Sequence, residues 1–149
     1  MVIFAVNIFK RVSNSHITGI TEFRLFYHKS CAMNANVEYT FKKGKDGCIV
    51  TVKPNRVPEK ELYETAVPDS FEAVLVDLLK KYRVGRWNGF NKFEKRIADG
   101  RSFTLNAALD NGRSISAHGY MKFPAGYREF RQEADDLFMP LYQKALPED

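Results

Sequence analysis

The segment Ser102-Phe-Thr-Leu-Asn-Ala-Ala-Leu-Asp-Asn-Gly-Arg-Ser-Ile-Ser-Ala-His-Gly-Tyr-Met121 decides the fold. Apolar residues occupy alternate positions on both sides of Asn111-Gly112: Phe103, Leu105, Ala107 and Leu109 before it, and Ile115, Ala117, Gly119 and Met121 after it. A period of two places them on one face of half-buried strands. Asn-Gly between such runs predicts a β-hairpin with a type I′ turn, which requires positive φ at both central residues.

The opposite face of this hairpin is polar, with Thr104, Asn106, Ser114, Ser116, His118 and Tyr120 at the intervening positions. Donors, acceptors and an aromatic ring suit a polar ligand or protein better than an apolar cofactor. We therefore predict a ligand-binding surface made of Asn106, Ser116, His118 and Tyr120, with Arg101 near the start of the first strand. The competing interpretation is an ordinary solvated sheet face.

Three more strands are predicted before the hairpin, at Thr21–His28, Val37–Lys42 and Cys48–Lys53, from alternation and β-branched residues. A turn at Lys43–Gly47 joins the last two, and its lysines would discourage association if these strands lie at a sheet edge. The proline-rich segment 54–68 reads as a long connection, with a possible helical turn around Glu59–Glu64. Residues 1–20 are interpreted as a short strand or packing arm followed by a loop.

Two helices are predicted from apolar residues at helical spacing. Helix 69–84 carries Phe71, Val74, Leu75, Leu78, Leu79 and Tyr82. Asp69 and Glu72 form a potential capping box at its start, and Gly85 follows its end. Helix 127–138 carries Tyr127, Phe130, Ala134, Leu137, Phe138 and Leu141, and its wet face is Glu129, Arg131, Gln132, Glu133, Asp135 and Asp136. Pro140 should kink or end it near Phe138.

These elements predict one α+β domain over residues 1–149, in the order βββα-ββα. We expect a mainly antiparallel sheet of about five strands with both helices packed on one face. The chain has 149 residues, enough to bury a substantial core. Its apolar content of 44% and charged content of 28% are ordinary for a soluble globular protein.

The expected location is the cytoplasm. Cys31 and Cys48 are too few for a disulfide framework, which suggests a reducing compartment. Met1–Phe9 is apolar but too short to cross a membrane, and no cleavage site typical of a signal peptide follows it. We expect no membrane association.

The basic charge is concentrated in residues 80–101, which hold eight basic residues against two acidic ones, while the chain as a whole has a net charge of +5. Arg86, Lys92, Lys95 and Arg96 could bind nucleic acid or phosphate, with Trp87, Phe90 and Phe93 available for stacking. In the favoured interpretation, Trp87 and Phe90 close the end of the core and the cations are solvated.

No catalytic or cofactor motif was found: the sequence lacks a P-loop, G-x-G-x-x-G, H-E-x-x-H, G-x-S-x-G and C-x-x-C. We therefore predict no catalytic residue, no cofactor and no metal. His28, Cys31 and His118 are too few and too scattered for a structural metal site. A hydrolase built around His118 and a neighbouring Ser or Cys is the least supported class, and Cys48 is expected to pack as an apolar residue.

A longer pattern comprises Trp87-x-Gly89-Phe90, Asp99-Gly100-x-x-Phe103-x-Leu105, Asn111-Gly112-x-x-Ile115-x-Ala117-x-Gly119 and Phe123-Pro124-x-x-Tyr127. It resembles a family of small uncharacterised bacterial proteins that has no established activity. The resemblance implies a bacterial α+β domain and no catalytic residue.

The leading functional prediction is a non-enzymatic binding or protein-interaction domain whose ligand is unknown. The alternative is a nucleic-acid or phosphate binder that uses the basic 80–101 segment. A salt titration of oligonucleotide binding separates the two, because phosphate contacts lose affinity steeply as salt rises. Oligomeric state and the identity of the partner do not follow from the sequence.

Overall fold

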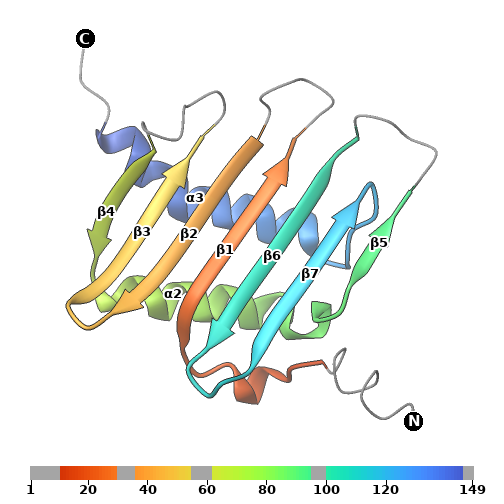
Figure 1. Ribbon diagram of the computed structural model, residues 1–149, viewed down its shortest axis with the longest axis horizontal. Helices are drawn as coiled ribbons and strands as arrows, with labels where there is room; N and C mark the ends of the chain where they lie inside the picture. Colours follow the sequence, from red (N-terminus) through yellow and green to blue (C-terminus); the bar gives the residue numbers. More distant parts are fainter. Residues whose placement is uncertain (1–10, 30–35, 55–61, 95–99, 146–149) are drawn as a thin grey trace.

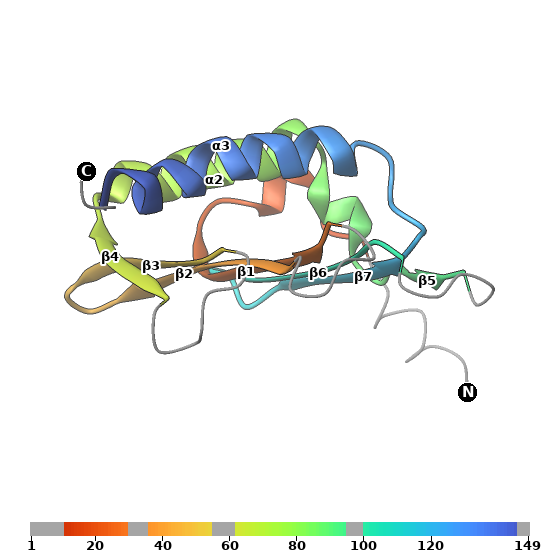
Figure 2. The ribbon, with the colours of Figure 1, turned by 90° about the horizontal axis from the view of Figure 1, so that it is seen from above.

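The computed structural model of the protein describes residues 11–29, 36–54, 62–94 and 100–145. They form an α+β fold in which two helices cover one face of a seven-stranded mixed sheet with strand order β4-β3-β2-β1-β6-β7-β5 (Figures 1 and 2). The elements are η1 (Asn14–His16), β1 (Ile20–His28), β2 (Asn36–Gly44), β3 (Gly47–Lys53), β4 (Tyr63–Val67), α2 (Asp69–Lys81), η3 (Val84–Trp87), β5 (Asn91–Phe93), β6 (Ser102–Leu109), β7 (Ser114–Tyr120) and α3 (Tyr127–Ala145). No helix in this described part of the chain is long and apolar enough to cross a membrane.

The prediction of about five strands was too low, because β4 and β5 were missed. The element order is consequently ββββα-βββα rather than βββα-ββα. Strand β4 includes Glu64, where a helical turn was predicted; residues 59–61 of that turn lie outside the described part of the chain. It pairs antiparallel with β3, so β4, and not the β2–β3 hairpin, forms this edge of the sheet. Strand β5 pairs parallel with β7, which makes the sheet mixed.

The central hairpin is confirmed, but its turn differs from the predicted type I′. Gly112 has φ +85°, whereas Asn111 is not among the described residues with positive φ. The Leu109 amide donates to the Arg113 carbonyl at 2.8 Å, and the Gly112 amide donates to the Leu109 carbonyl at 3.2 Å. This is a three-residue loop closed by a left-handed glycine, the other common hairpin solution after Asn-Gly. The Asn111 side chain accepts the Arg113 amide at 3.0 Å, which favours this loop.

We expect Gly112→Val to destabilise the protein far more than Arg113→Ala. A Cβ at Gly112 would meet nothing within 4 Å, so the cost comes from placing a β-branched residue at positive φ, about 1–2 kcal/mol. Arg113→Ala should change the free energy of unfolding by no more than about 0.5 kcal/mol. Urea denaturation measures both. Equal effects would contradict the left-handed turn, and Gly112→Asn, which tolerates this conformation, is the matched control.

Helix α2 begins at Asp69, but the predicted capping box is wrong. Pro68 occupies the N-cap position, and no side chain caps the helix. Glu72 instead accepts the Ile20 amide at 3.1 Å and pairs with the Lys43 ammonium at 3.0 Å. Its carboxylate therefore ties the helix to β1 and β2, because those strands offer it a backbone donor and a cation that a local cap cannot match.

The helix ends at Lys81 rather than at residue 84, and Arg83 then adopts φ 51° before η3. Gly85 does not supply the left-handed residue that follows the helix. It is buried, and its carbonyl accepts the Val12 amide at 2.9 Å. A Cβ there would lie 1.9 Å from the Val12 carbonyl oxygen, so glycine is required by the close approach of two backbone segments.

Helix α3 continues through Pro140 to Ala145, so of the two predicted outcomes, a kink or an end near Phe138, the end is wrong. Pro140 has no amide hydrogen to donate to the carbonyl of Asp136. Because Asp136 is exposed, water can donate to that carbonyl instead. Beyond the proline, the ring of Tyr142 packs edge-on against Tyr63 of β4, with centroids 6.3 Å apart. This packing of the last turn on the sheet favours the longer helix.

The core lies between the helices and the sheet and is rich in stacked aromatic rings. Phe138 of α3 stacks on Tyr39 with centroids 4.7 Å apart and meets Phe71 of α2 edge-on at 5.2 Å. At the other end, Trp87 is 4% exposed, which confirms the interpretation that it closes the core. Phe90 packs against the same cluster.

A partly buried polar cluster joins α3 to the sheet beside this core. Asp135, assigned to the wet face of the helix from the sequence, accepts hydrogen bonds from the Tyr27 hydroxyl at 2.7 Å and the Tyr39 hydroxyl at 2.5 Å. Burial raises the pKa of both tyrosines, and their contacts with Asp135 raise it further. Both hydroxyls therefore stay protonated as donors at neutral pH.

Candidate functional site

The face of the sheet opposite the helices is covered by neither α2 nor α3. Both helices lie on the other side (Figure 2), and within the described residues no helix covers this face. We define the open face by the strand residues that point away from the helices. They are Glu22, Arg24, Phe26 and His28 of β1; Asn36, Glu38, Thr40 and Lys42 of β2; Ile49, Thr51 and Lys53 of β3; Glu64 and Ala66 of β4; Asn91 and Phe93 of β5; Ser102, Thr104, Asn106 and Ala108 of β6; and Ser114, Ser116, His118 and Tyr120 of β7.

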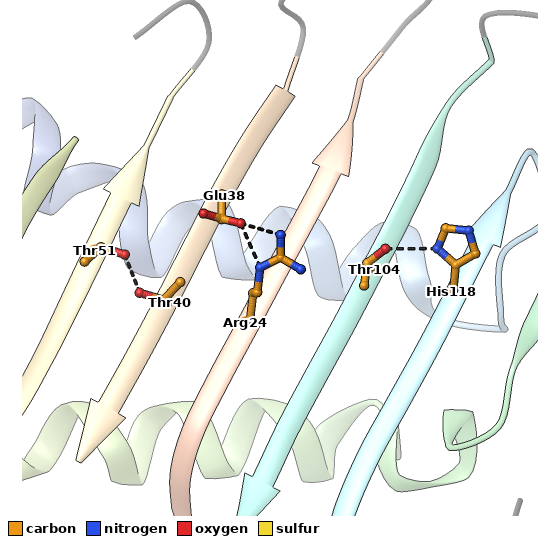
Figure 3. A network of polar contacts seen from close by, with 6 residues as sticks. All are labelled: Arg24, Glu38, Thr40, Thr51, Thr104 and His118. Carbon is orange, nitrogen blue, oxygen red and sulfur yellow. Dashed lines mark hydrogen bonds and ion pairs between the residues drawn. The ribbon is translucent and has the colours of Figure 1, made fainter. Parts of the chain in front are cut away.

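Polar side chains of the open face pair across neighbouring strands (Figure 3). The Arg24 guanidinium binds one oxygen of Glu38, with the Nε and Nη2 atoms at 2.7 and 2.6 Å. The hydroxyls of Thr40 and Thr51 are hydrogen-bonded. On the other side of β1, the Thr104 hydroxyl and the His118 Nδ1 atom lie 2.9 Å apart. These pairs order the side chains without burying them, so the open face is a preformed polar surface.

The predicted ligand-binding residues are partly brought together. Asn106, Ser116 and His118 are exposed on the open face, and the Ser116 hydroxyl donates to the Asn106 side-chain oxygen at 3.1 Å. Tyr120 is only partly exposed, because its hydroxyl accepts the Gly100 amide at 2.7 Å and holds the segment that leads into β6. Arg101 lines a separate cavity beside the start of α3.

A shallow concavity of about 450 Å³ crosses β2, β1, β6 and β7 on the open face. Asn106 and Ser116 line it together with three charged residues that sequence reasoning missed, Glu22, Arg24 and Lys42. The sequence indicates these residues only as the polar positions of two strands with alternating polarity. Their place beside the hairpin depends on the pairing of β1 with β6, which sets Arg24 opposite Asn106.

The charges of the open face are balanced. Its cations are Arg24, Lys42 and Lys53, and its carboxylates are Glu22, Glu38 and Glu64. Two exposed apolar side chains lie among them, Ile49 at 44% exposure and Phe93 at 53%. The positive net charge of the chain is therefore carried elsewhere.

The cations of the basic 80–101 segment do not form one surface among the described residues. Arg86 lines a small recess with Val12 and Arg83. Lys92 is exposed on β5, and its ammonium lies 5.4 Å from the centroid of the Phe90 ring. Lys95 and Arg96 lie outside the described part of the chain. Nucleic-acid binding by this segment stays a prediction.

Metal and nucleophile candidates are placed as follows. No three His, Cys, Asp or Glu side chains gather as metal ligands in residues 11–29, 36–54, 62–94 and 100–145, and Cys31 lies outside these ranges. Cys48 is buried on the helix side of the sheet, where burial raises its thiol pKa. A protonated thiol on the far side from His118 is poorly placed for attack on a ligand at the open face.

No protein-family model matches the chain, and no curated protein matches it significantly.

Proposed function

We propose that this protein is a non-enzymatic protein-interaction domain whose open face is the binding surface. The observation that carries the proposal is a sheet face that no described helix covers and whose polar groups are paired across strands. The elements beneath it are rigid strands held by a core of aromatic rings. Such a surface changes little on binding and so loses little conformational entropy.

The charge balance favours a protein over a nucleic acid as the partner on this face. Nucleic-acid binding requires an excess of protein cations, because these displace the counterions that surround the phosphate backbone of the nucleic acid. The open face has equal numbers of cations and carboxylates. A partner surface that also mixes both signs is complementary to it, because each charge can lie opposite one of the other sign.

A second copy of this chain has these properties, and we propose it as the partner. In a two-fold pairing the same patch meets itself, so a face with balanced charges is compatible with its own copy. Seven strands about 4.8 Å apart and about seven residues long present roughly 750 Å². Two such faces would bury about 1,500 Å² together, within the range for specific interfaces.

Sedimentation equilibrium across a wide range of protein concentrations tests this pairing. We expect reversible dimers for the native chain. The double variant Asn106→Glu/Ser116→Glu adds two carboxylates on β6 and β7 of each open face and should be monomeric, because the charge balance that makes the face compatible with its own copy is lost. The control variant Ser70→Glu/Gln143→Glu makes the same charge change at exposed positions on the two helices and should still dimerise. A monomeric native chain, or a dimer that survives in the Asn106→Glu/Ser116→Glu variant, would contradict the proposal.

We expect His118→Ala to leave folding intact while weakening binding at the open face. The His118 side chain is exposed and its Nδ1 atom lies 2.9 Å from the Thr104 hydroxyl, so its loss should change stability by no more than about 0.5 kcal/mol. Adding Tyr120→Ala should cost roughly another 1 kcal/mol, because Gly100 then loses its acceptor. Thermal melts and sedimentation separate the two effects. A His118→Ala variant that fails to fold would place this residue in the core.

A further inference from the structure

A cavity of about 480 Å³ lies where the end of β1 and the start of β6 meet the loop before α3 and the first turns of that helix. Four basic residues line it, Lys29, Arg101, Arg128 and Arg131, and Glu129 is its acidic residue. The excess of three positive charges contrasts with the neutral open face. We call this cavity the basic pocket.

Three of these cations have no ionic partner within the described part of the chain. Lys29, Arg101 and Arg128 are exposed, and no carboxylate of a described residue lies within 4.0 Å of their charged groups. Arg131 differs, since its guanidinium lies 5.0 Å from the centroid of the Tyr27 ring and 4.0 Å from Asp135. Like charges gathered from three separate segments repel each other, and a bound anion would relieve that repulsion.

The backbone at the start of α3 adds to the positive potential of the pocket. The Tyr127 amide donates to Pro124 at 3.1 Å and the Phe130 amide donates to Gly126 at 3.0 Å. The Arg128 and Glu129 amides between them have no acceptor among the described residues. Free first-turn amides and the helix dipole both favour an anion here.

One wall of the basic pocket is aromatic. Phe123 and Tyr127 both line it, and their rings are stacked with centroids 4.8 Å apart. Ser102 lines the pocket from β6. A volume of this size is typical of small-molecule sites, which combine an apolar wall with a few polar groups.

We propose that the basic pocket binds a small phosphate ester that carries a flat ring, of about the size of a mononucleotide. The cations of Lys29, Arg101 and Arg128 contact the phosphate, and Phe123 with Pro124 contacts the ring. This site shares His28 and Ser102 with the open face but none of the residues changed in the dimerisation test, so the two tests can fail independently.

Isothermal titration calorimetry with AMP, adenosine and inorganic phosphate tests the proposal on the full chain. We expect AMP to bind with an affinity that falls as salt rises, and adenosine to bind at least about tenfold more weakly, because it lacks the charged group. Inorganic phosphate should also bind more weakly than AMP, because it has no ring.

Matched charge variants locate the binding site. Arg101→Gln/Arg128→Gln should weaken AMP binding by at least about tenfold. Arg86→Gln/Lys92→Gln removes the same charge from exposed positions outside the pocket. Its affinity for AMP should stay within about twofold of that of the native chain. Thermal melts should show both variants folded, since all four side chains are exposed.

Several results would overturn the proposal. They are an absence of AMP binding, an equal loss in the two variants, and inorganic phosphate that binds as tightly as AMP. A single-stranded oligonucleotide that binds far more tightly than AMP, with the same dependence on Arg101 and Arg128, would assign the pocket to nucleic acid instead.

Discussion

Trp87→Ala is expected to lower the free energy of unfolding by about 3–5 kcal/mol, as truncation of a large buried aromatic residue does. The indole is 4% exposed and packs against Phe103, Tyr127 and Phe130, with ring centroids 6.4, 6.1 and 5.3 Å away. These rings belong to β6 and α3, while Trp87 itself ends η3. Its removal would open a cavity between the helix layer and the sheet that the surrounding backbone cannot fill.

Urea denaturation followed by far-ultraviolet circular dichroism measures this effect, because Trp87 is the single tryptophan of the chain and its fluorescence is lost in the variant. Phe93→Ala is the control, since that ring is 53% exposed on β5 and should contribute little. A denaturation midpoint for Trp87→Ala equal to that of the native chain would show that the indole is not part of the core.

Asp135→Ala is expected to cost about 2–5 kcal/mol. The substitution removes the acceptor of two tyrosine hydroxyls that lie 2.7 and 2.5 Å from the same carboxylate oxygen. Tyr27 is 2% exposed and Tyr39 is fully buried, so water does not readily replace the carboxylate. An unsatisfied buried polar group costs about 1–3 kcal/mol, and this variant leaves two of them.

Denaturation of a small set of variants isolates this cluster. Asp136→Ala removes a neighbouring but exposed carboxylate of the same helix and should be nearly neutral. The triple variant Tyr27→Phe/Tyr39→Phe/Asp135→Leu removes donors and acceptor together and should be more stable than Asp135→Ala alone. If Asp135→Ala and Asp136→Ala have equal stability, the cluster does not hold α3 on the sheet.

Part of the candidate site could be predicted from residue patterns. Asn106, Ser116 and His118 were placed on an exposed face from the alternation of one hairpin, and the structure places them there. Arg24 and Lys42 join that face only because β1 pairs with both β2 and β6. The basic pocket was not predicted, since its cations come from segments near residues 29, 101 and 128 that no local charge count connects.

Local periodicity determined which segments of this chain form strands and helices. The alternation in Phe103–Leu109 and the stripe from Phe71 to Leu79 each point to one buried face, and those residues are buried as predicted except Val74, which is 49% exposed. Such patterns are informative because side chains one helical turn apart, or two residues apart in a strand, lie on the same face of the element.

Only the tertiary structure decided the features whose partners are distant in sequence. The edge strands β4 and β5 formed where a neighbouring strand offered unpaired backbone groups. Glu72 binds Lys43 and the Ile20 amide instead of forming the predicted local cap. Asp135, predicted to face solvent, accepts hydrogen bonds from two buried tyrosines. In each case the partner is distant in sequence, so the interaction that replaces the solvated or local alternative exists only after the sheet and the helices have assembled.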